Sequence, residues 1–104
     1  MKKLFFGLVI GVLSLLGTSN VDARMMEVTA YTHTGGVMAN GEYPYVGAVA
    51  SDDLPLGTIV IINGSSYVVA DRFGGGYTDM IDVFVDTEEE AIQFGRQYID
   101  VEVV

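Results

Sequence analysis

The sequence predicts an all-β fold, a small closed barrel of six strands with one short helix. Six short runs of β-branched and aromatic residues are separated by glycine-rich turns, and a single stretch has the period of a helix. The chain has no cysteine, so disulfides cannot stabilise a small domain. Closure into a barrel removes exposed strand edges, which favours a barrel over a sandwich.

The first 23 residues have the layout of a secretory signal peptide. Two lysines precede an apolar run that ends at Leu16, and a small-residue site, Val21-Asp22-Ala23, follows. The apolar run is shorter than the ~20 apolar residues that a membrane-spanning helix needs. We therefore predict cleavage after Ala23, export of the protein and a single domain at residues 24–104. An uncleaved N-terminal anchor is the alternative.

Alternation of apolar and polar residues, together with β-branched runs, defines the strands in chain order. The predicted strands are residues 26–31, 46–50, 58–62, 66–70, 81–85 and 99–104. The third and fourth are joined by Asn63-Gly64, a pair that tolerates positive φ and is the strongest short signal of a hairpin. Residues 32–44, rich in glycine, are predicted to form a long loop.

A single helix is predicted at residues 88–96. Thr87 and Glu90 have the spacing of a capping box, in which each side chain accepts a hydrogen bond from the other residue's backbone N–H. Acidic residues in the first turn also interact favourably with the positive end of the helix dipole. One face of this helix would carry Ala91, Phe94, Gly95 and Tyr98.

Composition restricts the possible functions. The formal net charge is −9, and residues 24–104 contain three arginines and no lysine. Nucleic acid and anionic lipid would therefore be repelled. One histidine, His33, and no cysteine cannot supply a zinc site, and no Gly-Lys-Ser/Thr phosphate-binding loop is present. We expect no nucleic-acid partner, no metal, no cofactor and, after signal cleavage, no membrane association.

Carboxylates remain as candidates for chemistry, and residues 68–84 present them most clearly. An apolar strand ends at Asp71, a glycine-rich loop follows, and Asp82 lies among apolar residues of the next strand. A carboxyl group that is partly desolvated and near a second carboxylate is expected to have a raised pKa, as a general acid requires. Calcium binding is an alternative, although the usual calcium-loop pattern is absent. Turn capping suits Asp53, Asp79 and Asp86.

Five short motifs follow one another along the predicted domain. They are Gly-Val-Met-Ala-Asn-Gly at 36–41, Leu-Pro-Leu-Gly-Thr at 54–58, Val-Ala-Asp with Gly-Gly at 69–75, Ile-Asp-Val-Phe at 81–84, and Ala with Phe-Gly at 91–95. In this order they resemble the 3D domain, a family named for its aspartates. The family occurs in secreted bacterial cell-wall proteins and in the catalytic region of membrane-bound lytic transglycosylase A. The resemblance implies a double-psi β-barrel.

The resemblance also implies roles for individual residues. Asp82 would be the catalytic acid, and later the base, in cleavage of peptidoglycan between N-acetylmuramic acid and N-acetylglucosamine. Asp71 would orient or electrostatically tune Asp82, and Asp52 would be the first family aspartate, with Asp53 as the alternative. The substrate-binding residues assigned with them are Tyr31, Thr58, Arg72, Gly74 and Tyr77. Tyrosine stacks on sugar rings, and arginine binds carboxylates.

Three departures from the family pattern affect the expected substrate contacts more than the fold. The spacer before residues 54–57 is shorter, Met38 replaces a threonine, and residues 72–77 replace a segment that commonly has threonine and lysine. The leading prediction is a secreted, monomeric, cell-wall-associated bacterial enzyme of lytic-transglycosylase type. A non-catalytic glycan-binding barrel is the second reading, because so short a chain offers little surface for several sugars. A structural domain with a calcium or protein partner is the third.

Overall fold

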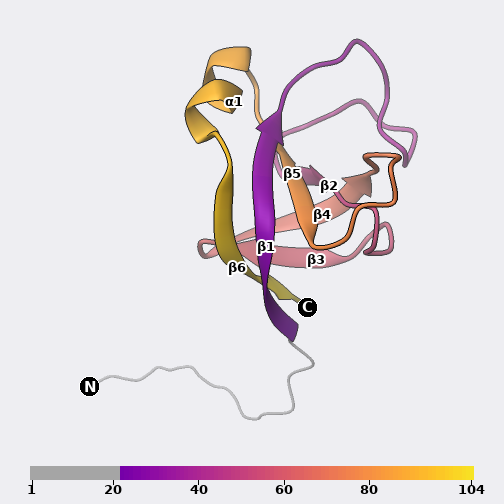
Figure 1. Ribbon diagram of the computed structural model, residues 1–104. Helices are drawn as coiled ribbons and strands as arrows, with labels where there is room; N and C mark the ends of the chain where they lie inside the picture. The colour runs from indigo at the N-terminus through magenta and orange to yellow at the C-terminus, as the bar shows by residue number, and fades with distance from the viewer. Residues whose placement is uncertain (1–21) are drawn as a thin grey trace.

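The computed structural model describes residues 22–104 (Figure 1). Most of the predicted signal peptide lies outside these residues, and its cleavage stays a prediction. Cleavage after Ala23 would remove the first two residues of strand β1, which begins at Asp22. Within the described part of the chain, no helix has both the length and the apolar character needed to cross a bilayer.

The predicted six strands and one helix are confirmed, with small shifts at their ends. In chain order the elements are β1 (Asp22–Tyr31), β2 (Ala48–Ala50), β3 (Ile59–Ile62), β4 (Ser65–Asp71), β5 (Met80–Phe84), α1 (Glu88–Phe94) and β6 (Gln97–Val103). The hairpin between β3 and β4 is confirmed as well. Asn63 and Gly64 have φ values of 52° and 84°, as a turn with two positive φ angles requires.

The strands form a closed barrel in the order β1-β5-β2-β4-β3-β6. The β1–β5 and β2–β4 pairs are parallel, and the other pairs are antiparallel. Exchanging β1, β2 and β3 with β4, β5 and β6, in that order, maps each strand pair either onto itself or onto a pair of the same direction. The barrel therefore has an internal twofold pattern, in which the β1–β2 loop corresponds to the β4–β5 loop.

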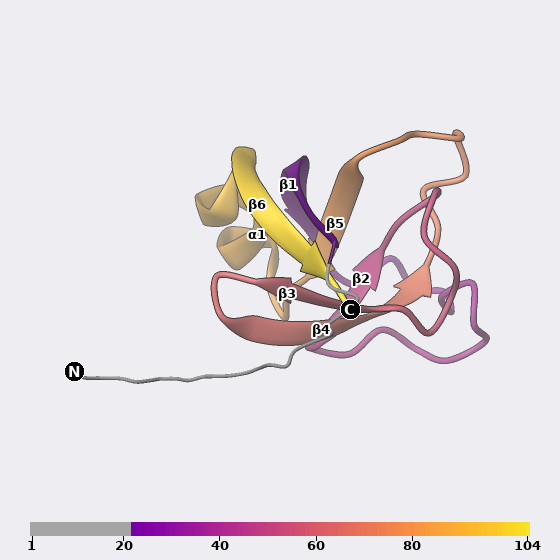
Figure 2. The same ribbon diagram turned by 90° about the horizontal axis from the view of Figure 1, so that it is seen from below.

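These two equivalent loops lie on the same side of the barrel, away from α1, in both Figure 1 and Figure 2. They contact the same end of β4. In the first loop, the Asn40 N–H donates to the Ala70 carbonyl at 3.1 Å. The two glycine-rich connections therefore meet where β4 ends, and this is the region that the predicted site occupies.

Alternate residues of every strand fill the interior of the barrel. The main buried cluster consists of Met26, Val28, Val49, Leu54, Val60, Ile62, Val69, Ile81, Val83 and Val101. Full burial of such aliphatic side chains contributes about 1.5–3 kcal/mol each. Because the interior takes Ile81 and Val83, the residue between them, Asp82, faces outward from the barrel.

The capping box at the start of α1 is confirmed, with Thr87 accepting from the Glu90 N–H and the Glu90 side chain accepting from the Thr87 N–H. The helix is shorter than predicted. Its C-cap is Gly95, whose φ is 66°, so the chain turns into β6 before the expected last turn. Tyr98 consequently lies in β6 and is 66 % exposed, and its predicted place on the helix face was wrong.

Candidate functional site

Asp71 and Asp82 are brought together by a strand that the sequence places far from both. Strand β2 lies between β5 and β4, and its last residue, Ala50, pairs with Asp82 on one side and with Asp71 on the other. Neighbouring strands lie about 4.8 Å apart, so the two aspartate Cα atoms are roughly 10 Å from each other. The expected glycine turn therefore links the two aspartates in sequence, but an alanine methyl group separates them in space.

A β-bulge gives Asp71 the same orientation as Asp82. Val49 pairs with Val69, but the next residue of β2, Ala50, pairs with Asp71, so Ala70 is skipped. The Val69 side chain belongs to the buried interior. Strict alternation from Val69 would turn Asp71 inward as well, and the extra residue turns it outward instead.

The two aspartates line a cavity of about 280 Å³ on the outer surface of the barrel. The lining residues are Tyr31, Thr34, Ala50, Asp71, Arg72, Phe73 and Asp82. Ala50 has a small side chain, so the surface between the two carboxyl groups is not filled. Thr34 comes from the β1–β2 loop, and Phe73 comes from the β4–β5 loop, so both equivalent loops contribute to the cavity lining.

Asp82 is half-buried, and burial is the main cause of its raised pKa. The Thr29 hydroxyl donates to Asp82 Oδ1 at 2.8 Å and opposes this rise, because the bond stabilises the charged form. The negative charge of Asp71 adds to the rise. The partial desolvation that the sequence predicts for Asp82 is therefore present, and it favours the protonated form that a general acid needs.

Asp71 accepts hydrogen bonds on both oxygens. Oδ1 accepts from the Ala39 N–H at 2.9 Å and from the Arg72 N–H at 2.8 Å, and Oδ2 accepts from the Tyr31 hydroxyl at 3.2 Å. Burial raises the pKa of Tyr31 above its ordinary value, and the charge of Asp71 raises it further. Tyr31 therefore keeps its proton at neutral pH and acts as a donor at the edge of the cavity.

Asp52 has a different role in the geometry of the site. Its Oδ1 accepts from the Phe73 and Gly74 N–H groups at 2.8 and 3.0 Å, and its Oδ2 accepts from the Gly75 and Tyr77 N–H groups at 3.1 Å each. These bonds, that of Gly74 first, lower the pKa of Asp52 to about 2. Asp52 does not line the cavity. Its contacts hold the β4–β5 loop, and the catalytic role assigned to it stays a prediction.

The alternative first aspartate, Asp53, holds the other end of the same loop. Its Oδ1 accepts from the Ser51 hydroxyl at 3.1 Å, and its Oδ2 accepts from the Asp79 N–H at 3.1 Å. Neither Asp52 nor Asp53 lies with Asp71 and Asp82 in the cavity lining. The structure thus brings together two of the three predicted catalytic aspartates.

The predicted substrate-binding residues divide in a similar way. Tyr31 and Arg72 line the cavity, and Arg72 Nη1 also donates to the Ser51 and Leu54 carbonyls at 2.6 and 2.5 Å. Thr58, Gly74 and Tyr77 lie outside the lining. The Thr58 hydroxyl donates to the Pro55 carbonyl at 2.7 Å.

Near the cavity rim, Tyr77 is half exposed and packs edge-on against Phe73, with ring centroids 5.7 Å apart. The Gly74 N–H donates to Asp52 Oδ1. These two residues therefore shape the rim through Phe73 and Asp52.

Four residues of the site were not predicted: Thr34, Ala50 and Phe73 line the cavity, and Thr29 contacts Asp82. Thr29 donates to Asp82, and Ala50 separates the two carboxyl groups. The alternation of residues 26–31 marks Thr29 as a polar, outward position. Its pairing with Asp82 depends on the parallel register of β1 and β5, for which the local sequence carries no signal.

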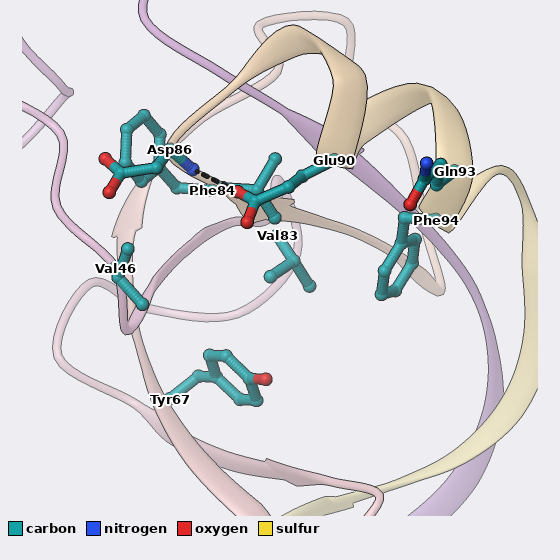
Figure 3. A pocket seen from close by; sticks show the side chains of 9 residues that line it. Val46, Tyr67, Val83, Phe84, Asp86, Glu90, Gln93 and Phe94 are labelled. Atoms are coloured by element: carbon teal, nitrogen blue, oxygen red, sulfur yellow. Dashed lines mark hydrogen bonds between the residues drawn. The ribbon is translucent and has the colours of Figure 1, made fainter.

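A second cavity of about 500 Å³ lies between α1 and the barrel wall (Figure 3). Its walls are mainly apolar, and Figure 3 shows Tyr67 and Phe94 on facing sides of the opening. Phe84 lines this cavity and packs edge-on against Tyr31, with ring centroids 5.6 Å apart. The Tyr31–Phe84 contact therefore separates the apolar cavity from the aspartate cavity.

The fold and the site define a six-stranded β-barrel protein with a paired-aspartate cavity on its outer surface. The sequence matches no protein-family model, and it has no match among curated proteins. The resemblance to the 3D domain therefore rests on the motifs quoted above and on nothing further.

Proposed function

We propose that this protein is a secreted bacterial cell-wall enzyme that cleaves peptidoglycan glycan strands, with Asp82 as the general acid and then the general base. One observation carries the proposal. Asp82 is a half-buried carboxyl group with a raised pKa, and it lines an open cavity beside a second carboxyl group. Pairs of carboxyl groups in unlike surroundings are typical of enzymes that cleave glycosidic bonds.

In the proposed reaction, protonated Asp82 donates its proton to the oxygen between N-acetylmuramic acid and N-acetylglucosamine, and the bond from this oxygen to the muramyl anomeric carbon breaks. Asp82, now a carboxylate, accepts the proton of the muramyl 6-hydroxyl as that oxygen attacks the anomeric carbon. An anhydro ring closes, and no water is consumed. Asp82 ends protonated, as it began.

Asp71 acts on this reaction through its charge and its position. Its carboxylate raises the proton affinity of Asp82, and its own oxygens are held by Tyr31 and two backbone N–H groups. A negative charge beside the anomeric carbon also stabilises the positive charge that develops there in the transition state. Tyr31 and Arg72 line the same cavity and are the proposed sugar contacts.

The test is release of anhydromuropeptides from isolated sacculi by the purified protein, followed by mass spectrometry. Wild type should release them, and Asp82→Asn should not, because an amide cannot supply the proton. Asp100→Asn, which changes an exposed carboxyl group of β6, is the matched control and should cleave normally. Equal release by wild type and Asp82→Asn would reject the assignment.

A second candidate function is binding of glycan strands without cleavage. The cavity volume of about 280 Å³ favours it, because common ligand sites measure about 300–1,000 Å³. A cavity near the lower end of that range can hold a single sugar unit, whereas cleavage needs a groove that positions several. In this case wild type and Asp82→Asn would both sediment with sacculi, and no anhydromuropeptide would appear. The same experiment thus separates the two functions.

A further inference from the structure

Asp82 has one hydrogen-bonding neighbour on β1. Thr29 pairs with Asp82 in the parallel register of β1 and β5, so the two side chains stand on the same face. The Thr29 hydroxyl oxygen lies 2.8 Å from Asp82 Oδ1 and 3.5 Å from the Ile81 carbonyl oxygen. A threonine hydroxyl has one proton to donate. The shorter contact is the better hydrogen bond, so this proton points at Oδ1.

The second oxygen of Asp82, Oδ2, has different surroundings. No group of residues 22–104 donates to it, yet it is not among the buried polar atoms of that part of the chain that are without a partner. It therefore remains open on the cavity side, where Asp82 contributes to the lining. The two oxygens of one carboxyl group are thus unequal, since one is occupied and the other is accessible.

We infer that Thr29 is a positioning residue: by occupying Oδ1, its hydroxyl leaves Oδ2 as the oxygen that carries the acid proton and presents it to the cavity. The inference rests on the proposed function for what receives the proton. In the reaction, the Oδ2–H bond breaks, the proton passes to the glycosidic oxygen, and the electron pair stays on Oδ2. The same oxygen later accepts the proton of the 6-hydroxyl, while Thr29 holds Oδ1 and exchanges no proton.

The other groups that face Asp82 do not duplicate this contact. The charged or titratable groups of the cavity are Asp71, Arg72 and Tyr31, and β2 contributes the Ala50 methyl group. The Tyr31 hydroxyl donates to Asp71, and Arg72 Nη1 donates to two backbone carbonyls. Among the described residues, Thr29 is therefore the side chain that donates to Asp82.

The test compares wild type with Thr29→Val, which keeps the shape and removes the hydroxyl, and with Thr29→Ser, which keeps the hydroxyl. Carbon-13 NMR of the Asp82 carboxyl group follows its titration without reference to activity. The pKa of Asp82 should rise in Thr29→Val, because the bond that stabilises its charged form is lost. It should stay at the wild-type value in Thr29→Ser. Thr78→Val, at an exposed loop position, is the control.

Kinetics on sacculi give the second readout. Thr29→Val should lower kcat about ten- to a hundredfold with KM unchanged, since the acid proton is no longer confined to Oδ2. The falling limb of its pH–rate profile should move to higher pH, and Thr29→Ser should restore both properties. If Thr29 had only a structural role, Thr29→Val would lower the stability of the protein without shifting the falling limb of the pH–rate profile.

An unchanged Asp82 titration in Thr29→Val would overturn the inference, and so would a Thr29→Ser protein that behaves like Thr29→Val. If Thr29→Val fails to fold, Thr29→Ala removes the same hydroxyl with less bulk and decides in its place. If wild type releases no anhydromuropeptides, the proposed function fails, and the carboxyl titration still decides the role of Thr29.

Discussion

Asp52 and Asp82 carry the same side chain in opposite surroundings. Four backbone N–H groups of the β4–β5 loop bind the oxygens of Asp52, and its pKa falls to about 2. One hydroxyl binds Asp82, burial dominates, and its pKa rises. The balance between hydrogen-bond donors and burial therefore decides whether the pKa of each carboxyl group falls or rises. Asp52 is a carboxylate that holds a loop, and Asp82 is the carboxyl group on which the surroundings favour a proton.

The largest expected effect is on activity, where the two aspartates should differ most. Asp82→Asn removes the proposed general acid and should lower kcat about 10²–10⁴-fold. Asp52→Asn changes no residue of the cavity lining, so its loss of activity should be much smaller. The measurement is anhydromuropeptide release by both variants under identical conditions. Equal losses would mean that the two aspartates belong to one catalytic unit and do not differ in role.

The second effect is on the loop that Asp52 holds. In Asp52→Asn, the side chain keeps one acceptor oxygen, and its NH₂ group cannot accept from the loop N–H groups. Some of the hydrogen bonds that hold the β4–β5 loop are therefore lost. Hydrogen exchange of the Phe73, Gly74, Gly75 and Tyr77 amides should become about tenfold faster or more in Asp52→Asn. In Asp82→Asn the exchange of these amides should stay as in wild type, which provides the control.

A third effect is on the backbone that surrounds Asp52. Gly74 has a φ of 93° and open space around it, so Gly74→Ala meets backbone strain rather than a clash. We expect it to lower the free energy of unfolding by about 1–2 kcal/mol in urea. Gly36 also has open space, and its φ is outside the positive range, so Gly36→Ala should be neutral. A loss of stability in both variants would show that the φ angle is not the cause.

The smallest effect is the pH dependence of stability, where the two aspartates act in opposite directions. The ordinary pKa is 3.8 for both. Asp52 has a lowered folded-state pKa, so its contribution is present above 3.8 and is lost as the pH falls through about 2. Asp82 has a raised folded-state pKa, so its contribution is present below 3.8 and is lost as the pH rises through the folded value.

Urea unfolding between pH 2 and 8 separates these two contributions. In Asp82→Asn, the free energy of unfolding should fall less steeply as the pH rises above 3.8. In Asp52→Asn, it should fall less steeply as the pH drops below 3.8. If Asp82→Asn leaves the stability above pH 3.8 unchanged, the pKa of Asp82 is not raised in the folded protein.

Local features of the chain were predictable because each depends on neighbours in sequence. The Asn63-Gly64 turn, the Thr87–Glu90 capping box and the alternation within the strands were all found where the pattern placed them. The partial burial of Asp82 followed from its apolar neighbours in the same strand. The end of α1 was misplaced because Gly95 was treated as part of an apolar face rather than as the C-cap.

Features that depend on strand order were not predictable in the same way. The insertion of β2 between β5 and β4 makes Ala50 the spacer between the two aspartates, and the parallel register of β1 and β5 gives Asp82 its hydroxyl partner. Both follow from which strands meet when the barrel closes. The four N–H donors to Asp52 come from a loop conformation that residues 72–77 do not specify by local pattern.

The β-bulge at Ala70 turns Asp71 toward the cavity only when β4 is paired with β2. Asp71 faces the cavity because β4 pairs with β2. The other edge of β2 pairs with β5, which carries Asp82, and β1 supplies the Thr29 hydroxyl that donates to Asp82. No hairpin or half of the chain holds these parts by itself. The unfolded chain carries aspartates of ordinary pKa, and the proposed cleavage of glycan strands would become possible only once the last strands have docked.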